Sequence, residues 1–245
     1  MAWRCSGTST ASLVGNLVRA RLCRTPRVEA ALLALDRAHY VRDAAAAYED
    51  APQPIGHGAT ISAPHMHVAC LELLAAYLQP GARALDCGSG SGYLTAAMMA
   101  MVGGGEGATG GGGAFGVECL EDLVEQSRAN VCADGKAYWL ADPSTFAFRH
   151  GDASRGWLEK GPFHAIHVGA AAPRVPRPLV EQLARPGRLV IPVGPNGGAQ
   201  ELTLVDKATD GSVSVRGGVM GVRYVPFHME GTEAYGPTSE PGSRL

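Results

Sequence analysis

The chain has 245 residues, of which 46% are hydrophobic and 18% charged, so its composition is that of an ordinary globular protein. This length suits one α/β domain with an N-terminal addition. Its 21 Lys and Arg against 23 Asp and Glu leave a net charge of −2, which argues against nucleic acid as a partner. No apolar run reaches the roughly 18 residues that span a bilayer, so we expect no membrane partner either.

The N-terminal segment allows two interpretations. The first 28 residues carry five arginines and no acid, a composition found in organellar transit peptides. The same segment also fits an amphipathic helix of the mature fold, with Leu13, Leu17 and Val18 on one face. Apolar residues recur at helical spacing over 12–22 and 27–35, and Thr25 can cap the second helix before Pro26. This pattern predicts an N-terminal helical subdomain over 1–80.

The following segments alternate between strand and helix patterns. Residues 49–60 contain proline and glycine without periodicity and predict a loop, after which Pro64 opens a helix to residue 78. Alternating strands and helices are typical of a parallel, doubly wound sheet. We expect strands at 82–86, 114–117, 146–148, 163–168 and 188–193, and helices at 93–101, 120–131 and 179–183, the last ending near Gly187.

The C-terminal part of the chain changes pattern. Residues 201–205 and 212–215 alternate around Thr209-Asp210-Gly211, which predicts an antiparallel hairpin, and 222–225 predict one more strand. The total is about seven strands in one mixed, mostly parallel sheet over 81–230. Eight glycines within 103–113 predict a mobile surface loop, because no Lys-Ser or Lys-Thr follows to make a phosphate-binding loop. Residues 231–245 predict a disordered tail.

One glycine-rich turn carries most of the chemical information. In Leu85-Asp86-Cys87-Gly88-Ser89-Gly90-Ser91-Gly92, a strand ends in an acid and turns through glycines into a helix. Glycine lets the backbone approach a ligand, and a helix start offers free N–H groups. The third glycine comes one residue earlier than in a dinucleotide turn. The preceding acid suits a cationic ligand such as S-adenosylmethionine, although a tight turn without a ligand explains the spacing as well.

Two further acids stand at predicted strand ends. Glu118 follows the strand at 114–117, where its carboxylate can accept both ribose hydroxyls of an adenosine. Asp152 follows the strand at 146–148, where it can reach the adenine amino group. Either acid alone would fit a solvated loop carboxylate. Three acids at successive strand ends favour a nucleoside cofactor in one crevice.

Several motifs in the same order resemble the protein-L-isoaspartate (D-aspartate) O-methyltransferase family. They are Thr60-Ile61-Ser62-Ala63-Pro64-His65-Met66-His67, the glycine turn, Ile166-His167-Val168-Gly169-Ala170-Ala171-Ala172-Pro173 and Leu189-Val190-Ile191-Pro192-Val193-Gly194-Pro195. The resemblance runs from Ala2 to Pro226. It implies a Rossmann-like, class I methyltransferase that moves the methyl of S-adenosylmethionine onto the α-carboxylate of L-isoaspartyl residues in damaged proteins and peptides. The ester then closes to a succinimide and partly returns as aspartyl. D-aspartyl is a second candidate acceptor, and S-adenosylhomocysteine is the product.

The resemblance also implies the site residues. Ser62 is the expected catalytic residue, which hydrogen-bonds the acceptor carboxylate. The expected substrate contacts are Ser62, His67, Val168, Tyr224 and Val225. The expected cofactor contacts are Thr60, Ile61, Ser62, Ala63, Pro64, His65, His67, Asp86, Gly88, Ser89, Gly90, Gly92, Glu118, Cys119, Asp152 and Ala153. We expect no metal, because His65 and His67 lack a third ligand at suitable spacing.

The residues themselves agree with a carboxylate acceptor. A carboxylate with a pKa of roughly 4 is ionised at neutral pH, so no general base is needed. One neutral hydroxyl on Ser62 can orient it without stabilising its ground state as an arginine would. Cys87, Glu118 and His164 depart from the family pattern, and only Glu118, which adds a methylene, is expected to alter the cofactor site.

Other functions fit part of this pattern. They are a different class I methyltransferase, a non-catalytic S-adenosylmethionine-binding protein and a nicotinamide oxidoreductase. The six cysteines form no C-x-x-C pair, which favours a reducing, cytoplasmic compartment. We expect a monomer.

Overall fold

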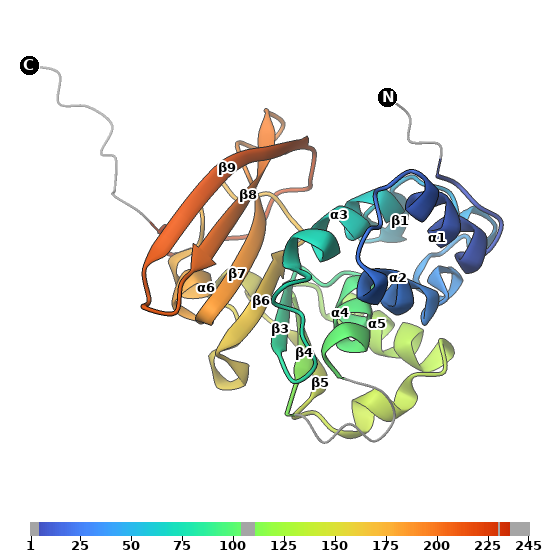
Figure 1. Ribbon diagram of the computed structural model, residues 1–245, viewed down its shortest axis with the longest axis horizontal. Coiled ribbons are helices and arrows are strands. Elements are labelled where there is room, and N and C mark those ends of the chain that lie inside the picture. The colour runs from blue at the N-terminus through green and yellow to red at the C-terminus, as the bar shows by residue number, and fades with distance from the viewer. Residues whose placement is uncertain (1–4, 104–110, 230, 236–245) are drawn as a thin grey trace, which may run out of the picture.

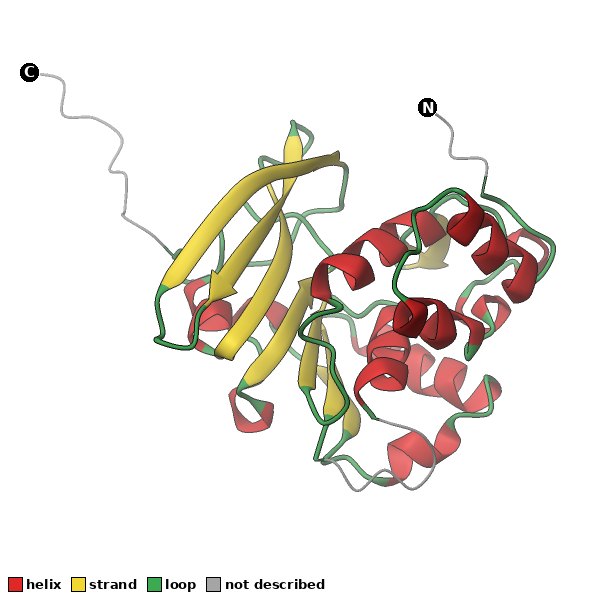
Figure 2. Cartoon of the chain, viewed as in Figure 1, coloured by secondary structure: helices red, strands yellow, loops and turns green. Residues whose placement is uncertain are grey.

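The computed structural model describes residues 5–103, 111–229 and 231–235. Within them, seven strands form one sheet in the order β5-β4-β3-β6-β7-β8-β9, drawn in yellow in Figure 2. The strands are β3 (Arg83–Cys87), β4 (Gly113–Glu118), β5 (Phe146–His150), β6 (Phe163–Val168), β7 (Leu183–Val193), β8 (Gln200–Lys207) and β9 (Val213–Val222). Strands β3 to β7 pair in parallel, whereas β8 is antiparallel to both of its neighbours. The prediction of a mixed, mostly parallel sheet is confirmed.

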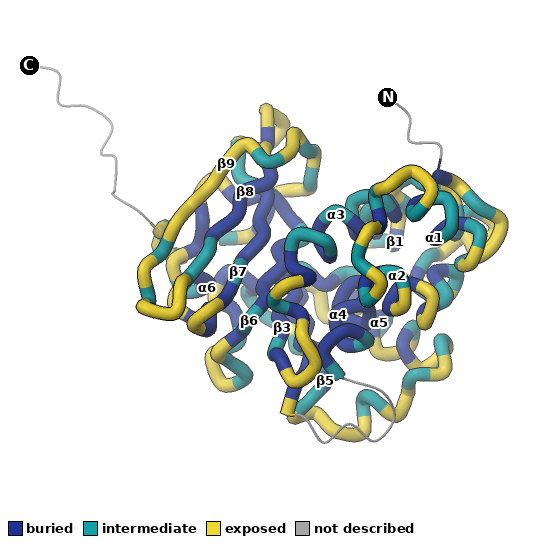
Figure 3. Tube along the Cα trace, in the orientation of Figure 1, coloured by how far each residue is buried: buried dark blue, intermediate teal, exposed yellow. Residues whose placement is uncertain are grey.

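The sheet separates two hydrophobic cores, because successive residues of a strand point to opposite faces. Ala84 of β3 packs in one core and Leu85 in the other. The first core is covered by α1 to α5, which gather on one side of the sheet in Figure 1, and the second by α6. The inner strands are buried along most of their length (Figure 3). The helices are α1 (Thr10–Arg19), α2 (Pro26–Leu33), α3 (Pro64–Leu74), α4 (Tyr93–Val102), α5 (Glu121–Ala133) and α6 (Arg177–Glu181).

The N-terminal helices belong to the first core. Helix α1 begins with a capping box between Ser9 and Ser12 and buries Leu13, Val14 and Leu17, which confirms an amphipathic helix of the fold. Thr25 stands at the N-cap position of α2, yet its hydroxyl donates to Glu72 at 2.8 Å instead of capping the helix. The predicted positions of the cap residue and of the first-turn proline are confirmed, although the Thr25 side chain does not cap the helix. Helix α3 ends at Leu74, four residues before the predicted end.

The predicted loop over 49–60 contains a short hairpin. Strands β1 (Gln53–Gly56) and β2 (Ala59–Ile61) pair antiparallel. Between them His57 and Gly58 both have positive φ, at 53° and 74°, as a two-residue hairpin turn requires. Histidine at the first turn position is no usual signal for such a turn, so the sequence pattern missed it.

Two C-terminal predictions need correction. Helix α6 ends at Glu181, and Leu183 already begins β7, so Gly187 lies within a strand where the β6–β7 register shifts. The strand predicted at 222–225 does not form, because β9 runs from Val213 to Val222 and the chain then leaves the sheet. The hairpin before it is confirmed, with Val205 paired to Val215.

Two of the predicted flexible segments fall partly outside the described residues. Residues 104–110 of the glycine-rich segment and 236–245 of the predicted tail lie there. Residues 231–235, also assigned to the tail, instead run beside α6. Arg177 N donates to Glu233 O and Tyr235 N to Val175 O, both at 2.8 Å. The unit boundaries at 80 and 230 remain predictions. None of the described helices combines the length and apolar character of a membrane span.

Candidate active site

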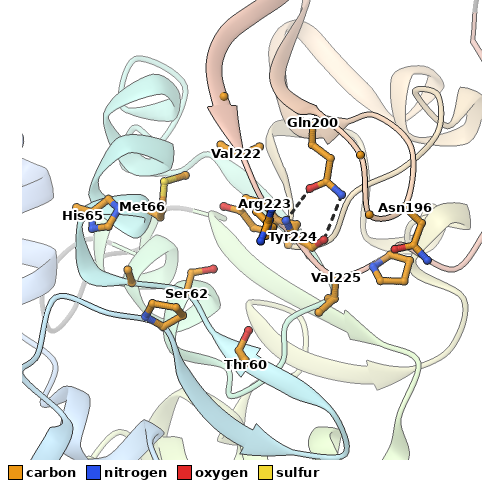
Figure 4. Close-up of a pocket in the computed structure, with 17 residues that line it drawn as sticks. Thr60, Ser62, His65, Met66, Asn196, Gln200, Val222, Arg223, Tyr224 and Val225 are labelled. Atoms are coloured by element: carbon orange, nitrogen blue, oxygen red, sulfur yellow. Dashed lines mark hydrogen bonds between the residues drawn. The ribbon is translucent and has the colours of Figure 1, made fainter. Parts of the chain in front are cut away.

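Two cavities open at the carboxyl ends of the parallel strands. We call them the turn cavity, of about 320 Å³, which reaches Gly88 and Gly90, and the Ser62 cleft, of about 780 Å³. The two share four wall residues, Thr60, Gly169, Val225 and Pro226. The two cavities therefore adjoin each other at these residues. Figure 4 shows the Ser62 cleft.

The glycine turn has the backbone that its sequence predicts. Gly88, Gly90 and Gly92 have φ of +78°, +53° and +82°, a region that side chains with a Cβ rarely adopt. At Gly92 a Cβ would also lie 2.8 Å from Ser127 and 3.0 Å from Phe148, so this glycine serves packing of α4. The backbones of Gly88 and Gly90 instead border the turn cavity.

Glu118 ends β4 and points its carboxylate to the rim of the turn cavity. Oε1 accepts backbone N–H bonds from Cys119 at 2.8 Å and Leu120 at 3.2 Å, and Oε2 accepts Gly90 N at 2.9 Å. The carboxylate thus ties the β4 end to the glycine turn. Among the described residues Oε2 accepts one hydrogen bond, from Gly90 N, which leaves it capacity for a ligand hydroxyl.

Asp86 does not line either cavity. Its side chain is buried, Oδ2 accepts the Thr95 hydroxyl at 2.6 Å, and Oδ1 lies 2.8 Å from His167 Nδ1. Burial alone would lower the pKa of His167, but hydrogen bonds with Asp86 and with Cys70 raise it to about 10. The carboxylate of Asp86, which the sequence analysis assigned to a cationic ligand, is thus paired with the protonated His167 instead. Sequence patterns missed this partner, although His167 stands within a family motif.

Asp152 is likewise occupied by neighbouring protein groups. Oδ1 accepts from the backbone N and hydroxyl of Ser154, and Oδ2 accepts Arg155 Nε at 3.1 Å. Burial would raise the pKa of Asp152, yet these hydrogen bonds lower it. The adjacent Ala153 lines the turn cavity, and Asp152 does not. This carboxylate fixes the shape of the loop after β5.

Ser62 directly follows β2 in the short segment that leads to α3 and faces Tyr224 across the cleft (Figure 4). Burial and Cys70 raise the pKa of Tyr224 well above its ordinary value, while a hydrogen bond with Ser62 acts in the opposite direction. Tyr224 stays a neutral hydroxyl at physiological pH. The cleft therefore presents two neutral hydroxyls at one point.

Gln200 holds the backbone of Tyr224 on the far wall of the cleft. Tyr224 N donates to Gln200 Oε1 at 2.6 Å, and Gln200 Nε2 donates to Tyr224 O at 3.2 Å (Figure 4). The next residue, Val225, accepts Ala171 N at 2.8 Å. The chain beyond β9 is thus pinned without being a strand. No sequence signal pointed to Gln200.

A buried arginine supports the Ser62 backbone from below. Arg37 has no exposed surface, and its Nη2 donates to Ser62 O at 2.8 Å. Its Nη1 lies 3.4 Å from His67 Nδ1, and the guanidinium stands 5.4 Å over the Tyr93 ring. Burial first, then Arg37, keep the pKa of His67 well below its ordinary value. His67 is therefore a neutral packing group and not a wall of either cavity.

His65 is fixed by a second buried charge. Asp50 has no exposed side-chain surface, and its Oδ1 accepts His65 N at 2.9 Å and lies 2.8 Å from His65 Nδ1. Asp50 also raises the pKa of Arg37, although burial lowers it to about 10 overall. Arg37 and Asp50 together hold the first turn of α3. Across the described ranges, no three His, Cys, Asp or Glu side chains form a metal-binding group.

The predicted site residues thus divide into three sets. Those lining the Ser62 cleft are Thr60, Ser62, Ala63, His65, Tyr224 and Val225. Those lining the turn cavity are Thr60, Gly88, Gly90, Glu118, Cys119, Ala153 and Val225. Those lining neither are Ile61, Pro64, His67, Asp86, Ser89, Gly92, Asp152 and Val168.

Known proteins share this sequence and this structure. The family model of protein-L-isoaspartate(D-aspartate) O-methyltransferase matches residues 8–231. A protein-L-isoaspartate O-methyltransferase of Triticum aestivum is 49% identical over 216 residues, covering 88% of this chain and 90% of the relative. One of Caenorhabditis elegans is 42% identical over 207 residues, covering 84% and 88%.

A solved structure from Plasmodium falciparum adds the third comparison. It is described as a protein-L-isoaspartate O-methyltransferase in complex with S-adenosyl-L-homocysteine. The two structures superpose with a TM-score of 0.81 and share 34% sequence identity. The match covers 91% of this chain and 99% of the Plasmodium falciparum chain. The sheet, the glycine turn and these matches define a Rossmann-like, class I methyltransferase fold. The chain belongs to the protein-L-isoaspartate (D-aspartate) O-methyltransferase family.

Proposed function

We propose that this chain transfers the methyl group of S-adenosylmethionine to the α-carboxylate of L-isoaspartyl residues in damaged proteins and peptides. The observation that carries the proposal is the wall shared by the turn cavity and the Ser62 cleft. A methyl donor in the first cavity and a carboxylate beside Ser62 in the second meet there. The methyl ester then closes to a succinimide as the next backbone nitrogen displaces methanol, and hydrolysis returns part of it as aspartyl.

The turn cavity fits the cofactor. Its volume of about 320 Å³ lies within the range of small-molecule sites, ~300–1,000 Å³. Glu118 Oε2 keeps acceptor capacity for a ribose hydroxyl, and the glycine backbones let a ligand approach closely. We assign the cofactor contacts to Gly88, Gly90, Glu118, Cys119 and Ala153. When bound, S-adenosylmethionine supplies an electrophilic methyl on a positively charged sulfur.

The residues of the Ser62 cleft orient the acceptor. The Ser62 hydroxyl donates a hydrogen bond to one carboxylate oxygen and leaves the other free to bond the methyl carbon. No side chain has to remove a proton, because the carboxylate is ionised at neutral pH. The neutral Tyr224 hydroxyl adds a weak partner without fixing the charge in its ground state. Occupation of both cavities by their ligands displaces water from the space between the two reacting charges.

The test is a methyl-transfer assay with labelled S-adenosylmethionine on an isoaspartyl peptide and on its aspartyl twin. We expect label in base-labile ester on the isoaspartyl peptide alone. A D-aspartyl peptide in the same assay measures the second candidate acceptor. Equal labelling of the aspartyl twin, or label on neither peptide while S-adenosylhomocysteine binds, would refute the proposal.

We further propose that the protein acts as a cytoplasmic monomer. The six cysteines are free thiols, which supports a reducing compartment. Sedimentation at assay concentration tests the first proposal, and fractionation of cells tests the second.

A further inference from the structure

One charged side chain in the Ser62 cleft has no role in the chemistry described above. Arg223 lines the cleft, is exposed, and makes no hydrogen bond or ion pair with any described residue. It is also the only Lys or Arg among the residues that line the cleft, and none of them is Asp or Glu. The cleft therefore has a single fixed positive charge.

The acid on the neighbouring strand does not neutralise this charge. Glu201 of β8 pairs in register with Gly221, two residues before Arg223. Its carboxylate instead lies toward Gly217 and Gly218, within 4.0 and 3.6 Å of where a Cβ on these glycines would stand. It forms no ion pair with Arg223. The guanidinium remains available to a ligand.

The backbone around Arg223 is held in place. Gln200 pins Tyr224 by two hydrogen bonds, and Ala171 N donates to Val225 O. Tyr224 turns its hydroxyl toward Ser62, while Arg223 is exposed at the cleft wall. Adjacent Cα atoms are ~3.8 Å apart and an extended peptide advances ~3.3 Å per residue. Arg223 is therefore offset from Tyr224 along the cleft wall by about the distance that separates an isoaspartyl residue from its neighbours in an extended substrate.

We propose that Arg223 forms a binding subsite for an acidic side chain flanking the isoaspartyl residue, so that the protein prefers acidic substrate segments. The proposal rests on the function proposed above and adds a class of preferred substrate to it. Because the pair forms at a partly exposed position, we expect a moderate effect, about threefold to fivefold in kcat/KM. The effect should reside in KM, since Arg223 does not touch the reacting atoms.

The experiment uses isoaspartyl peptides that carry Glu, Ala or Lys at one flanking position, varied from two before to two after. For the wild-type protein we expect kcat/KM to fall from Glu to Ala to Lys at one or more positions. In Arg223→Ala the three peptides should agree to within about 1.5-fold, and in Arg223→Glu the order should reverse. In ~0.5 M NaCl the wild-type preference should shrink, because salt screens exposed charges.

Arg216→Ala is the matched control. Arg216 is an exposed arginine on β9 that lines neither cavity, so its removal should keep the wild-type order. An unchanged Glu-over-Lys order in Arg223→Ala would overturn the inference. So would an equal loss of kcat on all peptides, which would place Arg223 on the reacting carboxylate. If the wild-type protein methylated none of the peptides, the proposed function itself would fail.

Discussion

The buried pair of charges beneath Ser62 allows a sharp prediction. Arg37→Met keeps most of the side-chain volume but removes the guanidinium that donates to Ser62 O and lies near His67. It also removes the cation that offsets Asp50, whose carboxylate has no exposed surface. We expect Arg37→Met to lower both the free energy of unfolding and the turnover number.

The magnitude follows from three contributions. A hydrogen bond from a charged donor contributes about 1.5–3 kcal/mol. Removing one partner of a buried ion pair costs about 3–5 kcal/mol, which is an upper bound here, because Asp50 acts on Arg37 electrostatically and forms its ion pair with His65. The two contributions overlap. The wild-type protein also buries Arg37 Nε without a hydrogen-bond partner, and the methionine variant avoids this cost, which reduces the net loss. We expect a net loss of about 3 kcal/mol. For a chain of this size that corresponds to a Tm about 6–12 °C lower.

Urea denaturation of the single and double variants measures this coupling. Asp50→Asn removes the opposing charge, so it should rescue Arg37→Met in part, with a coupling energy of about 1–3 kcal/mol. The control is Arg42→Met, because Arg42 also donates to a backbone carbonyl, Ile55 O at 2.9 Å, from an exposed position. We expect it to cost about 1 kcal/mol or less. Additive effects of Arg37→Met and Asp50→Asn within ~0.5 kcal/mol would refute the charge argument.

Three further predictions concern the two cavities and the buried histidine. Ser62→Ala should lower kcat at least about tenfold and leave the affinity for S-adenosylhomocysteine, measured by calorimetry, unchanged. An unaltered kcat would refute the role of Ser62 in orienting the acceptor carboxylate. Glu118→Ala should weaken the affinity for S-adenosylhomocysteine by about 10- to 100-fold, since a charge-assisted hydrogen bond is lost. Equal affinities of the variant and the wild-type protein would contradict the assignment of Glu118 to the cofactor site. Because the pKa of His167 is raised to about 10, its stabilisation is complete below its ordinary pKa of 6.5 and disappears as pH rises through 10. Unfolding free energies across this range should therefore decline in wild type and be flatter in His167→Gln, and parallel profiles would disprove the link.

The parts of the site that sequence could predict are local in the chain. The glycine turn was recognisable because positive φ at Gly88 and Gly90 requires glycine whatever the rest of the fold does. Glu118 was recognisable because it follows a strand directly, and strand ends of a parallel sheet meet at one edge. Gly88, Gly90 and Glu118 all line the turn cavity, and the family motifs led to Ser62 in the adjoining cleft.

The residues that sequence missed act through distant contacts. Arg37 and Gln200 have no motif, and an arginine is expected at the surface, yet here it is fully buried. Asp86 was assigned to the cofactor because its partner, His167, lies 81 residues further along the chain. The hairpin at 53–61 was missed because His57 adopts a positive φ that its side chain does not favour.

The sequence by itself determined the alternation of strands and helices in the parallel part of the sheet, the turn at Gly88 and the family, because periodicity and backbone conformation depend on neighbouring residues. Only the tertiary structure decided which acids face a cavity, which are paired with buried cations, and that Arg223 is left with an unopposed charge. Those outcomes depend on distances between residues far apart in the chain, and electrostatic energy depends on distance and burial.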